Sequence, residues 1–141
     1  MTPVYLESSA VLAWLFDEPQ GRRVPFIVDE APVVFFSPLT TTEVTRVLIR
    51  AVHAGRLTAA DDRRLRALLA DAAAGWAHIE IDDDMWRRAG ETFPAEPLRT
   101  LDALHLAAAL RVATAVPDLR VITFDRRITA AAAALGLNAT L

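Results

Sequence analysis

Four acidic residues stand where their side chains could do chemistry together. Glu7 directly follows the apolar run VYL, and Asp125 directly follows VITF. Glu43 and Asp102 fall within two segments that read as helices, and each has an apolar residue four positions along the same face. Carboxylates that meet at a partly buried point repel one another unless a cation is present. Oxygen ligands of this kind suit Mg²⁺ or Mn²⁺, which activate water and neutralise phosphoryl charge. The four residues, called the acidic cluster below, therefore predict a divalent-metal site.

The elements that would position these acids alternate between short apolar runs and amphipathic segments. Such alternation predicts an α/β fold, a mostly parallel central sheet flanked by helices, in a single domain over residues 1–141. In open α/β sheets, ligands bind beyond the carboxyl ends of the strands, where Glu7 and Asp125 would lie. The predicted strands are 3–6, 31–37, 77–82 and 119–124, with an edge strand at 138–141. Helices are predicted from Ser8 or Ser9 to 17 and over 37–55, 57–75, 82–93, 98–114 and 125–136.

Each acid also has a purely structural interpretation. Asp125 could simply cap the helix that follows it, and Asp102 could complement a helix dipole behind a Thr100 cap. Glu7 could be a surface residue at a strand end, and Glu43 could reach solvent on its long stem. Taken one at a time these readings are favoured; it is the convergence of four acids that favours a metal site.

Other chemistry-bearing residues fit structural roles better. Asp82, Asp83 and Asp84 resemble metal ligands but are typical of a helix N-terminus, as is the Asp61–Asp62 pair. The three histidines are scattered without zinc-ligand spacing. His105 lies three residues after Asp102 and is expected in the core or behind the acidic cluster.

Composition excludes several classes of function. The chain has no cysteine, which removes disulfides and thiol chemistry, and its 15 basic residues are all arginine, which removes lysine-dependent phosphate loops and receiver-type phosphoacceptors. A net charge of −3 does not indicate a broad nucleic-acid-binding surface. No apolar run approaches the ~20 residues of a membrane helix, and no basic region precedes the first apolar segment. We therefore expect a cytoplasmic protein without membrane contact.

Four stretches carry a resemblance to a known family. VYLESSAVLAWLFDEP, SPLTTTEVTRVL, LRTLDALHLAAAL and VITFDRRITAAAAALGL occur in the order and spacing of the PIN domain, in the version found in VapC-type toxins of bacterial toxin–antitoxin pairs. The resemblance spans residues 3–137, and its most specific motif is LDALHLA. It implies a single PIN domain acting as a Mg²⁺- or Mn²⁺-dependent ribonuclease that leaves 3′-hydroxyl and 5′-phosphate ends.

The resemblance also assigns roles to individual positions. It implies that Glu7, Glu43, Asp102 and Asp125 are the catalytic and metal-binding acids. It further implies that Ser9 and Thr123 support them by hydrogen bonding. As partners it implies RNA as substrate, a second copy of the chain in a homodimer, and a VapB-type antitoxin that could place an arginine at the acidic cleft.

Glu7 departs from the family pattern, which has an aspartate there. The extra methylene adds about 1.5 Å of reach, while Mg²⁺ demands near-ideal geometry. Three outcomes stay open: a strand end shifted to accommodate Glu7, a preference for Mn²⁺, or a weakened nuclease. Besides a toxin ribonuclease, two alternatives therefore remain. One is a PIN nuclease of RNA maturation or of DNA, and the other is a catalytically weakened or inactive domain that mainly binds antitoxin or RNA.

Overall fold

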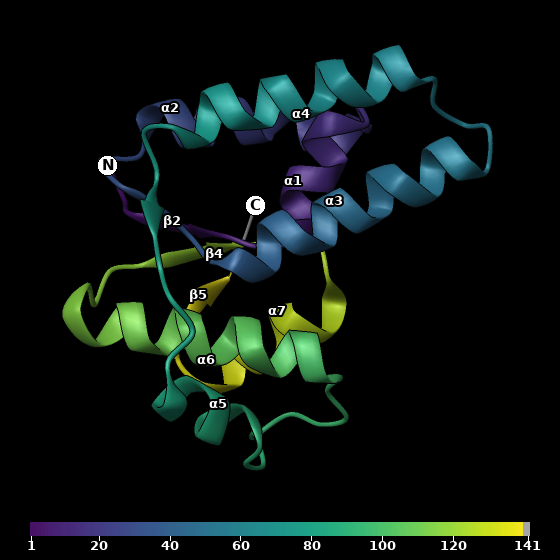
Figure 1. Cartoon of the computed structure of the whole chain (residues 1–141). Coiled ribbons are helices and arrows are strands. Elements are labelled where there is room, and N and C mark those ends of the chain that lie inside the picture. The colour runs from purple at the N-terminus through teal and green to yellow at the C-terminus, as the bar shows by residue number, and fades with distance from the viewer. Residues whose placement is uncertain (140–141) are drawn as a thin grey trace.

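The computed structural model describes residues 1–139 as one parallel sheet covered by helices on both faces (Figure 1). The strands are β1 (Val4–Leu6), β2 (Val34–Phe36), β3 (Ala77–His78), β4 (Arg120–Ile122) and β5 (Asn138–Ala139). The helices are α1 (Ser8–Leu15), a 3₁₀ turn (Pro19–Arg23), α2 (Val24–Glu30), α3 (Pro38–His53), α4 (Ala59–Ala73), α5 (Asp83–Ala89), α6 (Thr100–Ala115) and α7 (Arg126–Ala134).

The sheet has the strand order β3-β2-β1-β4-β5, and every pairing in it is parallel. The first strand is therefore central, and Leu6 pairs with Ile122 at the carboxyl ends of β1 and β4. The residues that follow, Glu7 and Thr123, are consequently neighbours although 116 positions separate them in the chain. The predicted α/β fold with a mostly parallel sheet is confirmed.

The central strand is buried on both faces. Val4 and Leu6 pack in a core under α1, α2, α3 and α4, whereas Tyr5 points into a second core under α5, α6 and α7. Figure 1 shows these two helical layers above and below the sheet. Parallel strands covered on both sides are apolar at every position, which explains why VYL does not alternate with polar residues.

The helix starts differ from the sequence-based expectation at two places that matter for the site. Helix α1 is capped by the Glu7 carboxylate, which accepts from the Ser9 amide, and neither Ser8 nor Ser9 is the cap. Helix α6 is preceded by Arg99 as the cap, and Thr100 is its first residue. In each case a carboxylate accepts from a backbone N–H at the helix start: Glu7 from the Ser9 amide, and Asp102 from the Arg99 amide at 3.1 Å.

The predicted strand 77–82 is shorter than expected, because only Ala77 and His78 pair with β2. The chain leaves the sheet there for the Asp82 cap of α5, which accepts from the Met85 amide. The predicted edge strand 138–141 is present as β5, and its last two residues lie outside the described part of the chain. Within residues 1–139, no helix is long and apolar enough to cross a bilayer.

Gly21 gives a test of how tightly the 3₁₀ turn packs on α1. A Cβ built on Gly21 would lie 2.1 Å from both the carbonyl carbon and the oxygen of Ala13. We expect Gly21→Ala to lower the free energy of unfolding by about 1–3 kcal/mol or more, because backbone cannot yield as a side chain can. A chemical denaturation curve measures this.

Gly75 is the matched control, because a Cβ there would meet no atom within 4 Å. Gly75→Ala should change the free energy of unfolding by less than about 0.5 kcal/mol. Equal stability of the two variants would contradict the close contact between the turn and α1.

Candidate functional site

The carboxyl ends of β1 and β4 hold the side chain of Glu7, which is 4% exposed. Its Oε2 atom accepts from the Ser9 amide at 3.0 Å and from the Thr123 hydroxyl at 2.8 Å, and the Ser9 hydroxyl donates to it as well. Ser9 Oγ in turn accepts from the Phe124 amide at 2.8 Å. The start of α1 and the end of β4 are thus joined through one carboxylate oxygen.

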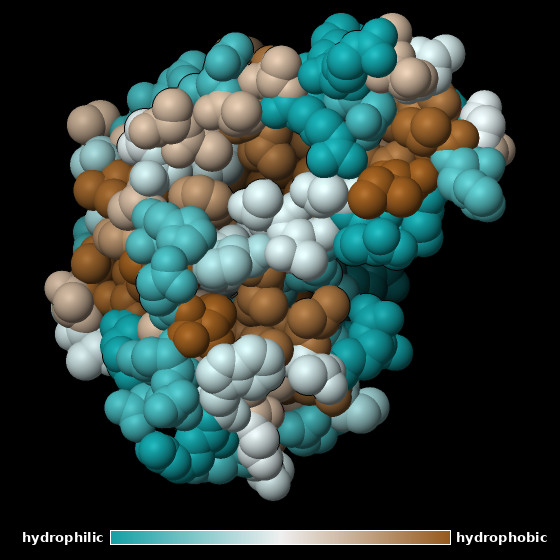
Figure 2. Space-filling model, viewed as in Figure 1, coloured by the Kyte–Doolittle hydropathy of each residue, from teal (hydrophilic) through white to brown (hydrophobic). Residues whose placement is uncertain are grey.

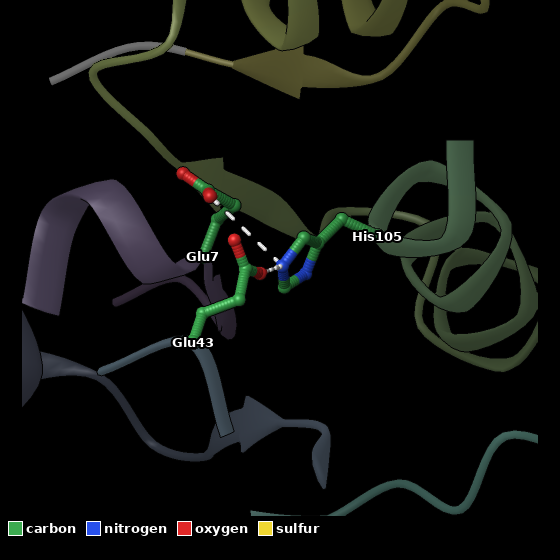
Figure 3. A group of neighbouring side chains, drawn as sticks. All are labelled: Glu7, Glu43 and His105. Carbon is green, nitrogen blue, oxygen red and sulfur yellow. Dashed lines mark hydrogen bonds and ion pairs between the residues drawn. The ribbon is translucent and has the colours of Figure 1, made fainter. Parts of the chain in front are cut away.

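Glu43 enters the same place from the second turn of α3. Its Oε1 atom accepts from the Ser8 hydroxyl at 2.8 Å and lies 2.6 Å from His105 Nε2 on α6. Glu7 Oε1 lies 3.9 Å from that same nitrogen. Figure 3 shows the three side chains of Glu7, Glu43 and His105 converging from three separate elements. Their ligand atoms all lie within 4.8 Å of one another, and we call them the inner group.

The electrostatic balance of Glu43 depends on its neighbours. Burial alone would raise the pKa of the Glu43 carboxyl, but the hydrogen bond and charge of His105 act against it. The Ser8 hydroxyl and the Arg99 charge act in the same direction, and together they lower the pKa below its usual value. Glu43 is therefore held as a carboxylate, the form that binds cations.

Asp102 and Asp125 form a second set, which we call the outer pair. The side chain of Arg99 lies beside both of them. Arg99 Nε lies 3.5 Å from Asp102 Oδ2, and Arg99 Nη2 lies 3.7 Å from Asp125 Oδ2. Asp125 uses its other oxygen to cap α7, accepting from the amides of Arg127 and Ile128 at 2.8 and 3.1 Å. Asp125 can therefore cap α7 and belong to the acidic cluster at the same time.

The inner group and the outer pair adjoin each other. Asp102 and His105 lie three residues apart on α6, and Glu43 shares the lining of a pocket with Arg99 and Asp102. Thr123 connects the two sets from the other side, since its hydroxyl donates to Glu7 and accepts from the Asp125 amide at 3.0 Å. All six residues named from the sequence therefore gather at one edge of the sheet, although the four acids do not meet at a single point.

The residues present fit a divalent cation. Among the described residues, the ion pairs of these four carboxylates are made with one arginine, Arg99, and one histidine, so negative charge exceeds positive charge at the site. Oxygen donors suit Mg²⁺ and Mn²⁺. A cation would relieve repulsion that hydrogen bonds alone only partly offset.

Sequence reasoning missed three participants: Tyr5, Ser8 and Arg99. Tyr5 looked like an ordinary core residue, yet its hydroxyl lies 3.0 Å from His105 Nδ1. Ser8 looked like a helix cap, yet it donates to Glu43. The sequence does indicate the contact of Arg99, because an arginine three residues before an acid at a helix start lies on the same face as that acid.

Comparison with known proteins agrees with this architecture. Residues 4–134 match the PIN domain family. The chain is 33% identical to Ribonuclease VapC46 of Mycobacterium tuberculosis, over 97% of this chain and 95% of that protein. It is 31% identical to Ribonuclease VapC35 of the same organism, over 95% of this chain and 83% of that protein.

Solved structures share the fold at lower identity. FitAcB from Neisseria gonorrhoeae superposes with a TM-score of 0.71 at 16% identity, covering 98% of this chain and 96% of that one. VapC20 of M. tuberculosis, described as a sarcin-ricin loop cleaving toxin, superposes with a TM-score of 0.65 at 16% identity, covering 91% of this chain and 94% of that one. With the family match and the two relatives above, these findings show that the chain belongs to the PIN domain family, in its group of VapC ribonucleases.

Proposed function

We propose that this chain is the toxin ribonuclease of a VapBC-type toxin–antitoxin pair. It would hydrolyse RNA phosphodiesters with Mg²⁺ or Mn²⁺ held by Glu7, Asp102, Asp125 and Glu43. The relatives named as VapC ribonucleases support the reaction class, and the charge of the site supports the metal. When bound, the ion supplies Lewis-acid activation and neutralises negative charge on the phosphodiester.

The observation that carries the proposal is the environment of the Glu7 carboxylate. One of its oxygens accepts three hydrogen bonds, two from Ser9 and one from Thr123. An aspartate at this position would place its carboxylate about 1.5 Å nearer the backbone, away from the point at which Ser9 and Thr123 now donate. The surroundings are therefore built for the longer side chain, which favours a working glutamate over a damaged aspartate site.

The chain's own residues would divide the work of binding and orientation. Ser9 and Thr123 orient Glu7, while Ser8 and His105 orient Glu43. Asp102 is buried and the side chain of Asp125 is 24% exposed, and both lie beside Arg99, whose side chain is 69% exposed. An exposed guanidinium at the edge of the acidic cluster is well placed to meet an RNA phosphate, because it binds phosphate oxygens in a bidentate manner.

An apolar groove beside Glu43 supports the antitoxin as a partner. The groove has a volume of about 520 Å³ and runs between α3 and the start of α5 and α6. Its lining includes Leu39, Val47, the 54%-exposed Trp86 and the 43%-exposed Leu101, together with Arg46 and Arg50. Figure 2 shows apolar residues exposed between the upper and lower helical layers on this side. An amphipathic antitoxin segment could bury this surface and bring an arginine to Glu43.

Removing one outer carboxylate tests the catalytic assignment. Asp102→Asn and Asp125→Asn should each lower metal-dependent RNA cleavage by about 10²-fold or more, because each removes a charge from the metal site. Asparagine can still cap a helix, so the melting temperature without metal should change little. Cleavage of total RNA by the purified chain in Mg²⁺, Mn²⁺ or EDTA measures this.

The same variants report on metal binding without RNA. Millimolar Mn²⁺ should raise the melting temperature of the parent by preferential binding to the folded state, and much less that of Asp102→Asn. Asp71→Asn, on the exposed side of α4, is the control and should behave as the parent in both assays. Parent-like cleavage by Asp102→Asn would show that the site is wrongly assigned.

Shortening Glu7 separates a working glutamate from a disabled site. Glu7→Asp should lower cleavage by about 10-fold, because the shorter carboxylate loses its bonds at β4 and its orientation. Thr123→Val, which removes the hydroxyl at similar volume, should lower cleavage in the same direction. RNA cleavage that appears only after Glu7→Asp would instead establish the alternative, a weakened nuclease whose present activity is binding.

Arg99 should compete with the metal for the outer pair. Arg99→Ala removes a positive charge 3.5–3.7 Å from Asp102 and Asp125, and we expect it to lower the Kd for Mn²⁺ by about 2–5-fold at low salt. Isothermal titration of the metal-free chain measures this affinity. Arg22→Ala, which breaks the exposed Arg22–Asp17 pair, is the matched control and should leave the Kd unchanged. Weaker Mn²⁺ binding by Arg99→Ala would contradict the competition.

A further inference from the structure

His105 is more buried than any of the four acids of the site, with 2% of its surface exposed. Its Nε2 atom lies 2.6 Å from Glu43 Oε1 and 3.1 Å from Ser8 Oγ. On the other edge of the ring, Nδ1 lies 3.0 Å from the Tyr5 hydroxyl. Both nitrogens therefore have partners on other elements, since Tyr5 belongs to β1, Ser8 to α1 and Glu43 to α3.

The short contact with Glu43 fixes where one proton lies. A nitrogen and a carboxylate oxygen 2.6 Å apart require a hydrogen between them, because two lone pairs at that distance repel. Ser8 Oγ donates to the same oxygen of Glu43. The Nε2–H group of His105 therefore donates to Glu43, and Ser8 adds a second donor.

On the far side of the ring, the Tyr5 hydroxyl is the hydrogen-bond partner of His105 Nδ1. Its hydroxyl lies 3.0 Å from His105 Nδ1 and 3.2 Å from Ser37 Oγ, and it can donate to one of them at a time. If Tyr5 donates to Nδ1, that nitrogen accepts; if Tyr5 donates to Ser37, an Nδ1–H group donates to Tyr5. Burial raises the pKa of the Tyr5 phenol well above its usual value, so the hydroxyl keeps its proton in both cases. Nε2–H faces Glu43 in either state.

Glu43 needs this support because its own helix does not orient its carboxylate. The side chain has three rotatable bonds and is half-buried at the entrance of the apolar groove. Without donors from α1 and α6, it would be free to swing toward solvent and the arginines of the groove. The inner group thus depends on a donor supplied from across the sheet.

We propose that His105 is a positioning residue for the proposed nuclease: its Nε2–H group holds the Glu43 carboxylate beside Glu7. Tyr5 orients the imidazole ring by its contact with Nδ1, and Ser8 donates a second hydrogen bond to the Glu43 carboxylate. The proposal rests on the proposed function only in that Glu43 serves the metal site. The hydrogen bond itself is a property of the metal-free chain. Two competing roles for His105, a packing role and a direct nitrogen ligand, make different predictions.

The first test reads the hydrogen bond directly in the metal-free protein. A ¹⁵N-edited proton spectrum of the imidazoles should contain one strongly downfield N–H proton that is slow to exchange with water. It should be absent in His105→Gln and shifted in both Glu43→Gln and Tyr5→Phe. Absence of such a proton in the folded parent would overturn the proposal, whether or not the chain cleaves RNA.

The second test separates positioning from packing and ligation. Glutamine can place an N–H donor near the Nε2 position, whereas leucine cannot. We expect His105→Leu to raise the Kd for Mn²⁺ and lower RNA cleavage by about 10–100-fold, the usual effect of losing a residue that orients a metal ligand. His105→Gln should retain most of both. If His105→Gln is as defective as His105→Leu while both melt near the parent temperature, the donor role is wrong.

A double-mutant cycle asks whether His105 acts through Glu43. In a Glu43→Gln background, adding His105→Leu should change the Kd for Mn²⁺ by less than about 3-fold, because the carboxylate that it holds is already gone. Effects that multiply in full would mean that His105 acts independently, and the proposal would fall. His78→Leu, which breaks the exposed His78–Glu80 pair, is the matched control and should match the parent.

Failure of the inference and failure of the proposed function give different patterns. A parent that binds no metal and cleaves no RNA, yet shows the downfield proton, would overturn the nuclease assignment and leave the His105–Glu43 bond established. A parent that is active and loses activity with Asp102→Asn but not with His105→Leu would overturn only the inference.

Discussion

The repulsion among four carboxylates at one edge of the sheet is the constraint on which the site depends. Each acid is kept in place by donors of its own: Ser9 and Thr123 for Glu7, Ser8 and His105 for Glu43. Asp102 and Asp125 are held by backbone amides and by Arg99. Hydrogen bonds donated to a carboxylate favour its charged form. The fold thus preserves a concentration of negative charge that a divalent cation can neutralise.

The sheet topology makes these local solutions possible. Because β1 pairs with β4, the residue after each strand lies beside the other, and a single hydroxyl from Thr123 can reach Glu7. The central strand also faces both cores, so Tyr5 can support His105 from below while Leu6 packs above the sheet. A donor on β1, an acid on α3 and a histidine on α6 therefore act on one another although no two of them are close in sequence.

The sequence was sufficient to predict the fold and the edge of the sheet at which the acids lie. It did not predict which side chains each acid contacts. Apolar runs ending in Glu7 and Asp125 predicted the right edge of the sheet, because strand ends are read from local pattern. The division into the inner group and the outer pair could not be read that way, since it depends on which side chains reach across 62 to 116 residues. Sequence pattern favours a serine as the cap of α1 because serine is the commoner cap, whereas in the structure the longer Glu7 side chain accepts from the Ser9 amide.

The two halves of the acidic cluster differ in how their charge is balanced, and this difference sets how they respond to their surroundings. The inner group is held by short hydrogen bonds among side chains that are buried or half-buried, so dissolved salt screens it weakly. In the outer pair Asp102 is buried and Asp125 is 24% exposed, but the arginine at 3.5–3.7 Å from them is 69% exposed, so salt, phosphate or an incoming cation can displace its guanidinium. We therefore expect a ligand to displace Arg99 more readily than the hydrogen bonds that orient Glu7 and Glu43. In such a site, one set of hydrogen bonds orients the carboxylates, and a different, more exposed contact is the one that a ligand displaces.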